Sequence, residues 1–225
     1  MTKPQRAERD PLDRPSVVAA GIALADDDGV AALTMRGLAE RLGFKVMALY
    51  NHVASKDELL ALMVDAVAGS IELPGEHLPP LSAIRMHAIA TREVFVRHPW
   101  VTALWQQHVP GPNRIDHMES LLRSFGESGL PADIAHHGFH AVNNHVVGYS
   151  LQELAMGLDA AAPDADAVVE RFLATLVEEN HPYTVAHIDE HLHGATASSF
   201  ELVLDLILDG LVALPSRRGV GESTD

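Results

Sequence analysis

The chain has 225 residues, of which 47% are hydrophobic and none is cysteine. A chain of this length and apolar content forms one or two compact domains and is not a disordered acidic tail. The lack of cysteine excludes disulfides, thiol nucleophiles and thiolate metal sites, and a formal net charge of −15 argues, taken as a whole, against nucleic-acid binding.

The charge is unevenly distributed along the sequence. The first 60 residues hold 8 basic and 9 acidic residues, a net charge of −1, whereas residues 61–225 hold 8 basic and 22 acidic residues, a net charge of −14. All three lysines, Lys3, Lys45 and Lys56, lie in the first part. This asymmetry indicates an N-terminal module that tolerates a polyanion, joined to an acidic one.

Four helices are expected in the N-terminal third. Residues 1–14 are polar and predict a flexible arm. A helix follows from Pro15 until the aspartates before Gly29 stop it. Thr34 is expected to cap a short helix over residues 35–42 that ends at Gly43, and a second short helix follows over about 45–52. Ser55 and Glu58 form a capping-box pattern that opens a longer helix, reaching about residue 72.

Beyond a proline-rich break at residues 73–80 the pattern remains helical, with no strand alternation. We therefore expect an all-α protein: an N-terminal three-helix helix-turn-helix domain over 15–60, with a connecting helix to about 72, and a C-terminal helical bundle over 80–214. Residues 215–225 are expected to form a flexible tail. No signal peptide precedes the first helix, and the apolar run 202–214 is too short and carries two aspartates, so we expect a cytoplasmic protein without a membrane span.

The two short helices around Gly43 have the layout of a helix-turn-helix. The glycine permits the positive φ of a sharp turn, and Ala39 is small where the helices cross. The second helix exposes side chains that can reach base edges and phosphates in a major groove: Lys45, Ala48, Tyr50, Asn51 and His52.

The run from Leu33 to Leu60 resembles the DNA-binding domain of the TetR family of transcriptional repressors. The patterns Leu-Thr-x-Arg-x-Leu-Ala-x-x-Leu-Gly and Leu-Tyr-x-His-Val-x-x-Lys-x-x-Leu-Leu carry the match. The resemblance implies that Thr34, Met35 and Arg36 contact phosphate, that Lys45, Val46 and Ala48 face the bases, and that Tyr50, His52 and Lys56 clamp the backbone. Asn51 replaces the aromatic residue common in the family and adds an amide that can bind adenine or phosphate.

The C-terminal part is similar, more weakly, to the tetracycline-repressor subgroup through His98-Pro-Trp100, Gly111-Pro-Asn113 and the pattern that begins at Phe200. That resemblance implies a homodimer in which the last helix and the helix near 132–157 of each subunit form a four-helix interface. The last helix is apolar around much of its circumference, which fits this role; the alternative is a central helix in a monomer. Such a dimer is expected to bind a palindromic operator in double-stranded DNA.

Polar side chains recur among apolar ones in the bundle, and a small-molecule effector is one class of partner for them. The candidate ligand-binding residues are Met86, His87, Trp105, His108, Met118, Phe125, Phe139, His140, Asn143 and Tyr149. His108 is similar to the loop histidine that tetracycline repressors use on a magnesium-bound drug. The partner-subunit carboxylate is only loosely matched by Gln152-Glu153, so neither tetracycline nor a metal or other cofactor is expected.

Two alternatives remain. His187-Ile-Asp-Glu190-His191 matches the His-x-x-Glu-His pattern of inverted zinc proteases, which indicates a metal-dependent hydrolase, but only 34 residues follow His191 to supply a third ligand. With 14 histidines in the chain, such a pattern arises readily by chance. The other alternative is a DNA-binding regulator that does not respond to a small molecule.

Overall fold

The computed structural model of the chain describes residues 11–75, 77–156, 171, 173–176, 180–193 and 199–215. These residues form helices, turns and loops, and none of them lies in a strand, which confirms the all-α prediction. Most of the predicted N-terminal arm (1–10) and of the tail (216–225) lies outside the described residues. Among the described helices none is long and apolar enough to cross a membrane.

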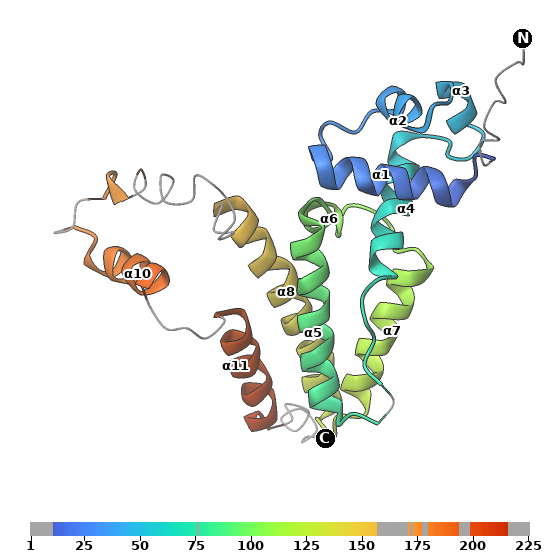
Figure 1. Ribbon diagram of the computed structural model, residues 1–225. Helices are drawn as coiled ribbons and strands as arrows, with labels where there is room; N and C mark the ends of the chain where they lie inside the picture. The colour runs from blue at the N-terminus through green and yellow to red at the C-terminus, as the bar shows by residue number, and fades with distance from the viewer. Residues whose placement is uncertain are drawn as a thin grey trace, which may run out of the picture. The chain divides into compact units, whose positions relative to one another are not determined.

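The chain, whose helices are labelled in Figure 1, divides into two compact units, and each unit consists of two separate stretches of sequence. The first unit contains residues 1–70 and 98–116, and the second contains residues 71–97 and 117–225. The sequence predicted a second domain over 80–214, whereas the structure groups residues 98–116 with the first unit.

The first unit is built on helices α1 (Arg14–Asp28), α2 (Met35–Leu42), α3 (Val46–Leu49), α4 (Lys56–Ala68) and α6 (Pro99–Leu104). Helix α1 packs against α2 and α4, α2 packs against α3, and α6 contacts both α1 and α4. The core side chains are almost fully buried; they include Val17, Leu33, Leu38, Leu49, Leu59 and Met63. Gly21 allows α1 to approach α4 closely, because a Cβ there would lie 2.9 Å from Sδ of Met63.

Three predicted helices have different bounds in the structure, and one of them, α4, ends at Ala68 and not near residue 72. Helix α1 begins one residue earlier, at Arg14, because Asp13 and Ser16 form a capping box, and the hydrogen bonds from Ser16 lower the pKa of Asp13. The helix also runs through all three aspartates and ends only at Gly29, whose φ is 79°. The second helix of the pair is shorter than predicted: only Val46–Leu49 is helical, and residues 50–52 form a turn.

Within the first unit, two aspartates attach residues 98–116 to helices α1 and α4. The carboxylate of Asp26 on α1 accepts hydrogen bonds from Nε1 of Trp100 (2.6 Å) and lies 2.8 Å from Nδ1 of His98. The carboxylate of Asp65 on α4 accepts from the backbone N–H groups of Asn113 (3.3 Å) and Arg114 (3.0 Å). Asp65 therefore caps the N-terminus of the helix that begins at Pro112, although it lies 48 residues before Asn113 in the sequence.

The second unit contains α5 (Pro80–Arg97), α8 (Ala132–Met156), α10 (Pro182–His193), α11 (Ser199–Ala213) and most of α7 (Pro112–Gly126). Helices α5, α8 and α11 pack against one another. A close approach occurs at Gly138 on α8, where a Cβ would lie 2.7 Å from the ring of Phe125 and 2.9 Å from Leu211. Most of residues 157–179, which belong to the predicted bundle over 80–214, lie outside the described residues.

Candidate DNA interface and ligand-binding bundle

The helix-turn-helix is held together by local capping and an apolar core. Oγ1 of Thr34 accepts from the N–H of Gly37 at 3.0 Å, which starts α2 as predicted. Gly43 adopts the left-handed conformation with φ of 73° and ends it. Beneath the turn Leu38 and Leu49 are fully buried. These contacts fix the orientation of α3 and leave its outer side chains in solvent.

The structure places most of the predicted DNA contacts on the surface of the first unit. The exposed ones are Thr34, Arg36, Lys45, Tyr50 and Asn51; Val46, Ala48, His52 and Lys56 are half-buried; and Met35 is buried. Because the side chain of Met35 is buried, a phosphate contact at this position would have to use the backbone. Arg36 pairs with Glu40 at 3.0 Å, an exposed pair that contributes little to stability and leaves the guanidinium available to a phosphate.

Two residues that the site prediction omitted also bear on this surface. Met47 lies in the middle of α3 with 74% of its surface exposed. An apolar side chain held in solvent at that place is suited to contact with thymine methyl groups. Nε of Arg14, which the sequence placed in the flexible arm, donates to the carbonyl of His52 at 2.9 Å and ties α1 to the turn after α3. The Asp13–Ser16 capping pattern was the signal that would have placed Arg14 in a helix.

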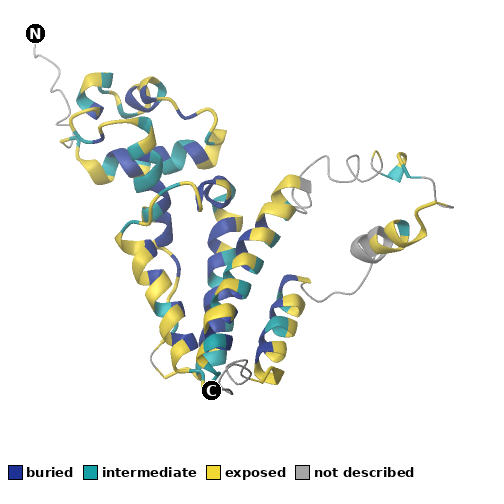
Figure 2. Ribbon diagram, turned by 180° about the vertical axis from the view of Figure 1, so that it is seen from behind, coloured by how far each residue is buried: buried dark blue, intermediate teal, exposed yellow. Residues whose placement is uncertain are grey.

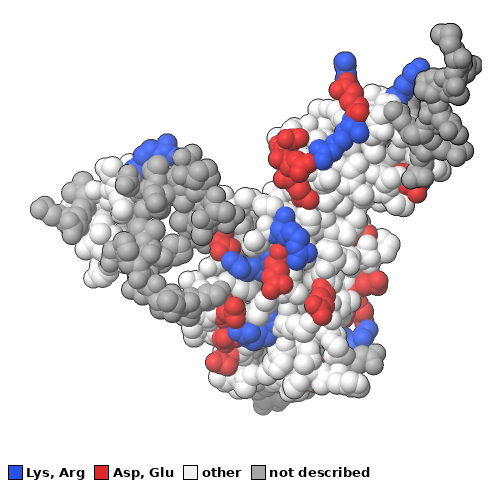
Figure 3. Space-filling view, viewed as in Figure 1, with Lys and Arg blue, Asp and Glu red and all other residues white. Residues whose placement is uncertain are grey.

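Charge on this unit is mixed. On the face drawn in Figure 3, the helix-turn-helix carries Lys and Arg side chains next to acidic ones, and the coloured residues form no continuous basic surface. On this face positive charge therefore comes from individual side chains and not from a broad basic surface.

The ten candidate ligand-binding residues fall in both units. Trp105 and His108 belong to the first unit and the other eight to the second. His87, Trp105 and Phe125 are buried, Met118 and His140 are exposed, and Met86, His108, Phe139, Asn143 and Tyr149 are half-buried. The structure thus gives these residues several distinct environments.

A buried histidine pair lies between α5 and α7 in the second unit. The rings of His87 and His117 have centroids 4.0 Å apart. Oγ1 of Thr91 donates its only hydrogen to the carbonyl of His87 (2.7 Å), so Nε2 of His117, at 2.9 Å, must be the donor to Oγ1. Burial, and secondarily the neighbouring His117, lowers the pKa of His87 to about 3. His87 is therefore neutral at physiological pH.

Neither ring nitrogen of His87 has a hydrogen-bond partner among the described residues. Nε of Arg92 and Oγ of Ser150, on α5 and α8, are likewise buried and without partners there. Buried polar atoms are normally hydrogen-bonded, so each of these atoms is a place where a ligand can supply the missing interaction.

A cluster of polar and aromatic side chains links α5 to α8 and α11. Nη2 of Arg92 donates to the carboxylate of Glu153 at 2.8 Å, and its guanidinium lies over the rings of Tyr149 and Phe200. Desolvation, followed by the charge of Glu153, raises the pKa of Tyr149. The ring of His145 stacks on that of Phe200 and completes the group. These contacts hold Tyr149 in place by aromatic packing.

Trp105 and His108 are both held by Arg114. The buried guanidinium donates to the carbonyls of Trp105 (2.5 Å) and His108 (2.9 Å) and lies over the indole ring. Burial lowers the pKa of Arg114, and the charge of Asp65 partly opposes this. The guanidinium of Arg114 thus places a fixed positive charge beside Trp105 and His108.

Apolar side chains are exposed in the single chain along α11 and at the C-terminal end of α8, and both helices carry exposed residues in Figure 2. The exposed residues include Leu151 and Leu154 on α8, and Leu202, Val203, Leu206 and Val212 on α11. On α11 the opposite face is buried against the bundle through Phe200, Leu204, Leu208 and Leu211. Exposed apolar surface of this kind marks a contact site.

The His-x-x-Glu-His pattern lies on helix α10. His187 is exposed, and the side chains of Glu190 and His191 lie outside the described residues. Within the described ranges there is no group of three or more His, Cys, Asp or Glu side chains that could hold a metal ion.

Comparison with known proteins identifies both parts of the chain. Residues 17–63 match the family described as "Bacterial regulatory proteins, tetR family", and residues 82–214 match "Tetracyclin repressor-like, C-terminal domain". The HTH-type transcriptional repressor DrrR1 of Streptomyces coeruleorubidus is 30% identical over 234 residues, which cover 98% of this chain and 84% of that protein.

Two further matches agree. An HTH-type transcriptional regulator of Saccharopolyspora erythraea is 37% identical over 140 residues, which span 61% of this chain and 59% of that protein. The crystal structure of ActR from Streptomyces coelicolor in complex with actinorhodin has a TM-score of 0.73 at 28% identity and covers 91% of this chain and 98% of its own. These are DNA-binding regulators and not enzymes, so the hydrolase alternative has no support. The chain belongs to the TetR family of transcriptional regulators.

Proposed function

We propose that the protein is a homodimeric repressor that binds a palindromic operator through α2 and α3 and leaves it when a small molecule binds the second unit. We also propose that it acts in the cytoplasm, where its DNA target is. The observation that carries the DNA-binding part is the surface of the first unit: Lys45, Tyr50 and Asn51 are exposed above the fully buried Leu38 and Leu49. A rigid core beneath polar groups is what base and phosphate contacts require.

The exposed apolar faces of α8 and α11 support dimerisation. A second copy that covers Leu206 and Leu202, which are 63% and 57% exposed, would remove this surface from water. Two helices from each copy then form a four-helix interface. The dimer places two copies of α3 on one DNA duplex, with half-sites about 10 base pairs apart, one helical turn.

The buried atoms without partners support a ligand response. His87 presents one N–H donor and one acceptor nitrogen that nothing among the described residues satisfies. An effector with a matching acceptor or donor gains hydrogen bonds that the described residues do not supply. Such a ligand shifts the equilibrium toward the conformation in which it binds best, which for an inducer is the one with low DNA affinity.

A fluorescence-anisotropy titration with DNA that flanks the protein's own coding sequence tests the proposal. Saturable binding that unlabelled specific DNA displaces, and scrambled DNA does not, supports an operator in that region. A metabolite panel is then added to the complex. Release by one compound supports the repressor–effector pair, whereas DNA binding that no compound alters favours a regulator without small-molecule response.

A further inference from the structure

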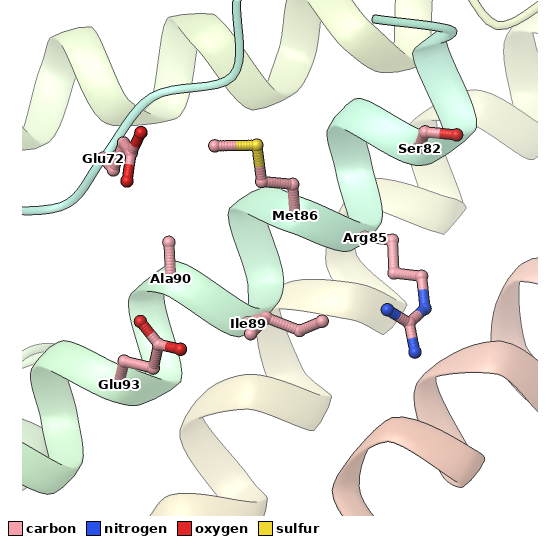
Figure 4. Close-up of a pocket in the computed structure, with 7 residues that line it drawn as sticks. All are labelled: Glu72, Ser82, Arg85, Met86, Ile89, Ala90 and Glu93. Carbon is pink, nitrogen blue, oxygen red and sulfur yellow. The ribbon is translucent and has the colours of Figure 1, made fainter.

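One face of α5 carries a pocket (Figure 4), and Met86 alone among its lining residues belongs to the ten candidate ligand-binding residues. Its volume is about 510 Å³, and it is lined by Glu72, Ser82, Arg85, Met86, Ile89, Ala90 and Glu93. The α5 residues recur at intervals of three and four, so they share one face of the helix. His87 and Thr91 lie on the opposite, buried face.

The floor of the pocket is apolar. Met86, Ile89 and Ala90 are half-buried, and the first and last of these project toward the chain segment that contains Glu72 (Figure 4). The volume falls within the range of small-molecule sites, roughly 300–1,000 Å³. The floor is suited to a hydrocarbon or aromatic body and offers it few hydrogen bonds.

The rim of the pocket is negative. Glu72 and Glu93 are exposed at one end of it, and neither carboxylate has a hydrogen-bond or ion-pair partner among the described residues. The one cation in the lining, Arg85, is already paired: Nη2 donates to Glu201 and Nε to Asp205, each at 2.7 Å. Counting these five side chains, the charge around the pocket is +1 − 4 = −3.

We propose that this pocket binds an organic cation with an apolar body, the body lying on Met86, Ile89 and Ala90 and the charge between Glu72 and Glu93. Charge complementarity identifies the occupant: an anion would meet two unpaired carboxylates, and Arg85 has its donors turned toward α11. The net charge of −14 on residues 61–225 adds a field that raises the local concentration of cations. The pocket is a ligand site separate from the one proposed around His87.

Binding is measured on the full-length protein without DNA, so the result does not depend on the proposed repressor function. Tetraphenylphosphonium and tetraphenylborate are the probes, because they have nearly the same size and shape and opposite charge. Isothermal titration in a sodium buffer is expected to show saturable binding of the cation, weakened by added salt, and at least about tenfold weaker binding of the anion.

Two sets of variants locate the site. Each of Glu72→Gln and Glu93→Gln is expected to weaken cation binding about threefold, and the double variant about tenfold, as exposed charge pairs do. The double variant Glu119→Gln/Glu127→Gln changes the net charge equally, at one position on α7 and one directly after it, and is expected to have less than a twofold effect. Ala90→Trp fills the pocket without changing charge and is expected to abolish binding, with the melting temperature used to check folding.

The proposal fails if tetraphenylborate binds as tightly as tetraphenylphosphonium. It also fails if the α7 control double variant weakens binding as much as the pocket variant, because the cation would then respond only to overall charge. Unchanged binding in a folded Ala90→Trp variant places the cation elsewhere and overturns the assignment.

Discussion

The helix-turn-helix segment, residues 11–70, and the bundle differ in how completely their buried polar groups are satisfied. Within the described part of residues 11–70 no buried side-chain nitrogen or oxygen lacks a partner. Helices α2 and α4 begin at the capping side chains Thr34 and Ser55, and α2 ends at Gly43. Along α5 and α8, His87, Arg92 and Ser150 all have such atoms. The comparison indicates that residues 11–70 satisfy their buried polar groups internally, whereas the bundle contains buried polar atoms that a ligand or a water molecule can satisfy.

The largest effect is expected for a substitution in the apolar core of residues 11–70. Leu38→Ala removes a fully buried side chain and is expected to lower the free energy of unfolding by about 2–5 kcal/mol, because a cavity adds to the lost apolar burial. Urea denaturation followed by circular dichroism measures this. Leu73→Ala, at a position that is 43% exposed, is the matched control and should change stability by less than about 0.5 kcal/mol. Equal losses in both variants would contradict a tightly packed core.

His87→Leu is expected to act in the opposite direction. An apolar side chain of similar size removes two unsatisfied polar atoms, so stability at pH 7 should rise by about 1 kcal/mol while the response to an effector is lost. Urea denaturation and effector-dependent release of DNA are the two measurements. A loss of 2 kcal/mol or more would show that His87 has a partner inside the folded chain.

The stability of the wild-type protein has a pH dependence that this variant lacks. The pKa of His87 is about 3 in the folded protein and about 6.5 in the unfolded chain, so the unfolded state alone takes up this proton as the pH falls below 6.5. The contribution of neutral His87 to the free energy of unfolding is therefore complete above pH 6.5, and it is lost progressively as the pH falls toward 3. Between pH 6.5 and pH 4 the wild-type protein should therefore lose more stability than His87→Leu. Parallel curves for the two proteins would refute the buried neutral state.

Asp65→Ala tests how α7 is attached to α4, because the carboxylate of Asp65 on α4 caps the N-terminus of α7. Loss of the cap is expected to cost about 0.5–2 kcal/mol of unfolding free energy. Glu119→Ala removes an exposed carboxylate from the same helix without removing a cap, and it should be nearly neutral. If thermal denaturation shows the same melting temperature for both variants, Asp65 does not stabilise α7.

The smallest effect on folding is expected for Lys56→Ala, which should change DNA binding instead. Removing one phosphate contact per subunit weakens binding to all operators similarly and reduces the slope of log K against log salt by about 0.9 for each contact. Arg123→Ala, on α7, makes the same charge change away from the DNA-binding surface. Anisotropy titrations at several salt concentrations measure these slopes. If log K depends on log salt with the same slope in both variants, Lys56 does not contact phosphate.

Sequence patterns were sufficient where one residue type determines the local backbone. Thr34 caps α2, Gly43 takes the left-handed conformation, and Ser55 accepts from the N–H of Glu58, all as predicted. The carboxylate of Glu58 accepts from Ala54 and not from the N–H of Ser55 that a capping box would use. Its partner thus lies one residue before the predicted one, since a long side chain can reach either amide.

Long-range polar contacts were not predictable in the same way. The pairing of Asp26 with Trp100 joins residues 74 positions apart, and that of Arg92 with Glu153 joins residues 61 apart. No local spacing encodes such pairs, so the grouping of residues 98–116 with the first unit was missed. Likewise, the sequence identified His87 as a polar residue among apolar ones, but only the structure shows that its nitrogens lack partners among the described residues.

The division of the chain restricts how it can be cut. The polypeptide passes between the two units at three places, after residues 70, 97 and 116. A fragment that ends at residue 70 would therefore lack α6, and it would leave the carboxylates of Asp26 and Asp65 without the groups that they bind. The DNA-binding motif is continuous in sequence, but the folded unit that supports it is assembled from two separate stretches of chain, so genetic truncation or a single proteolytic cut does not release it whole.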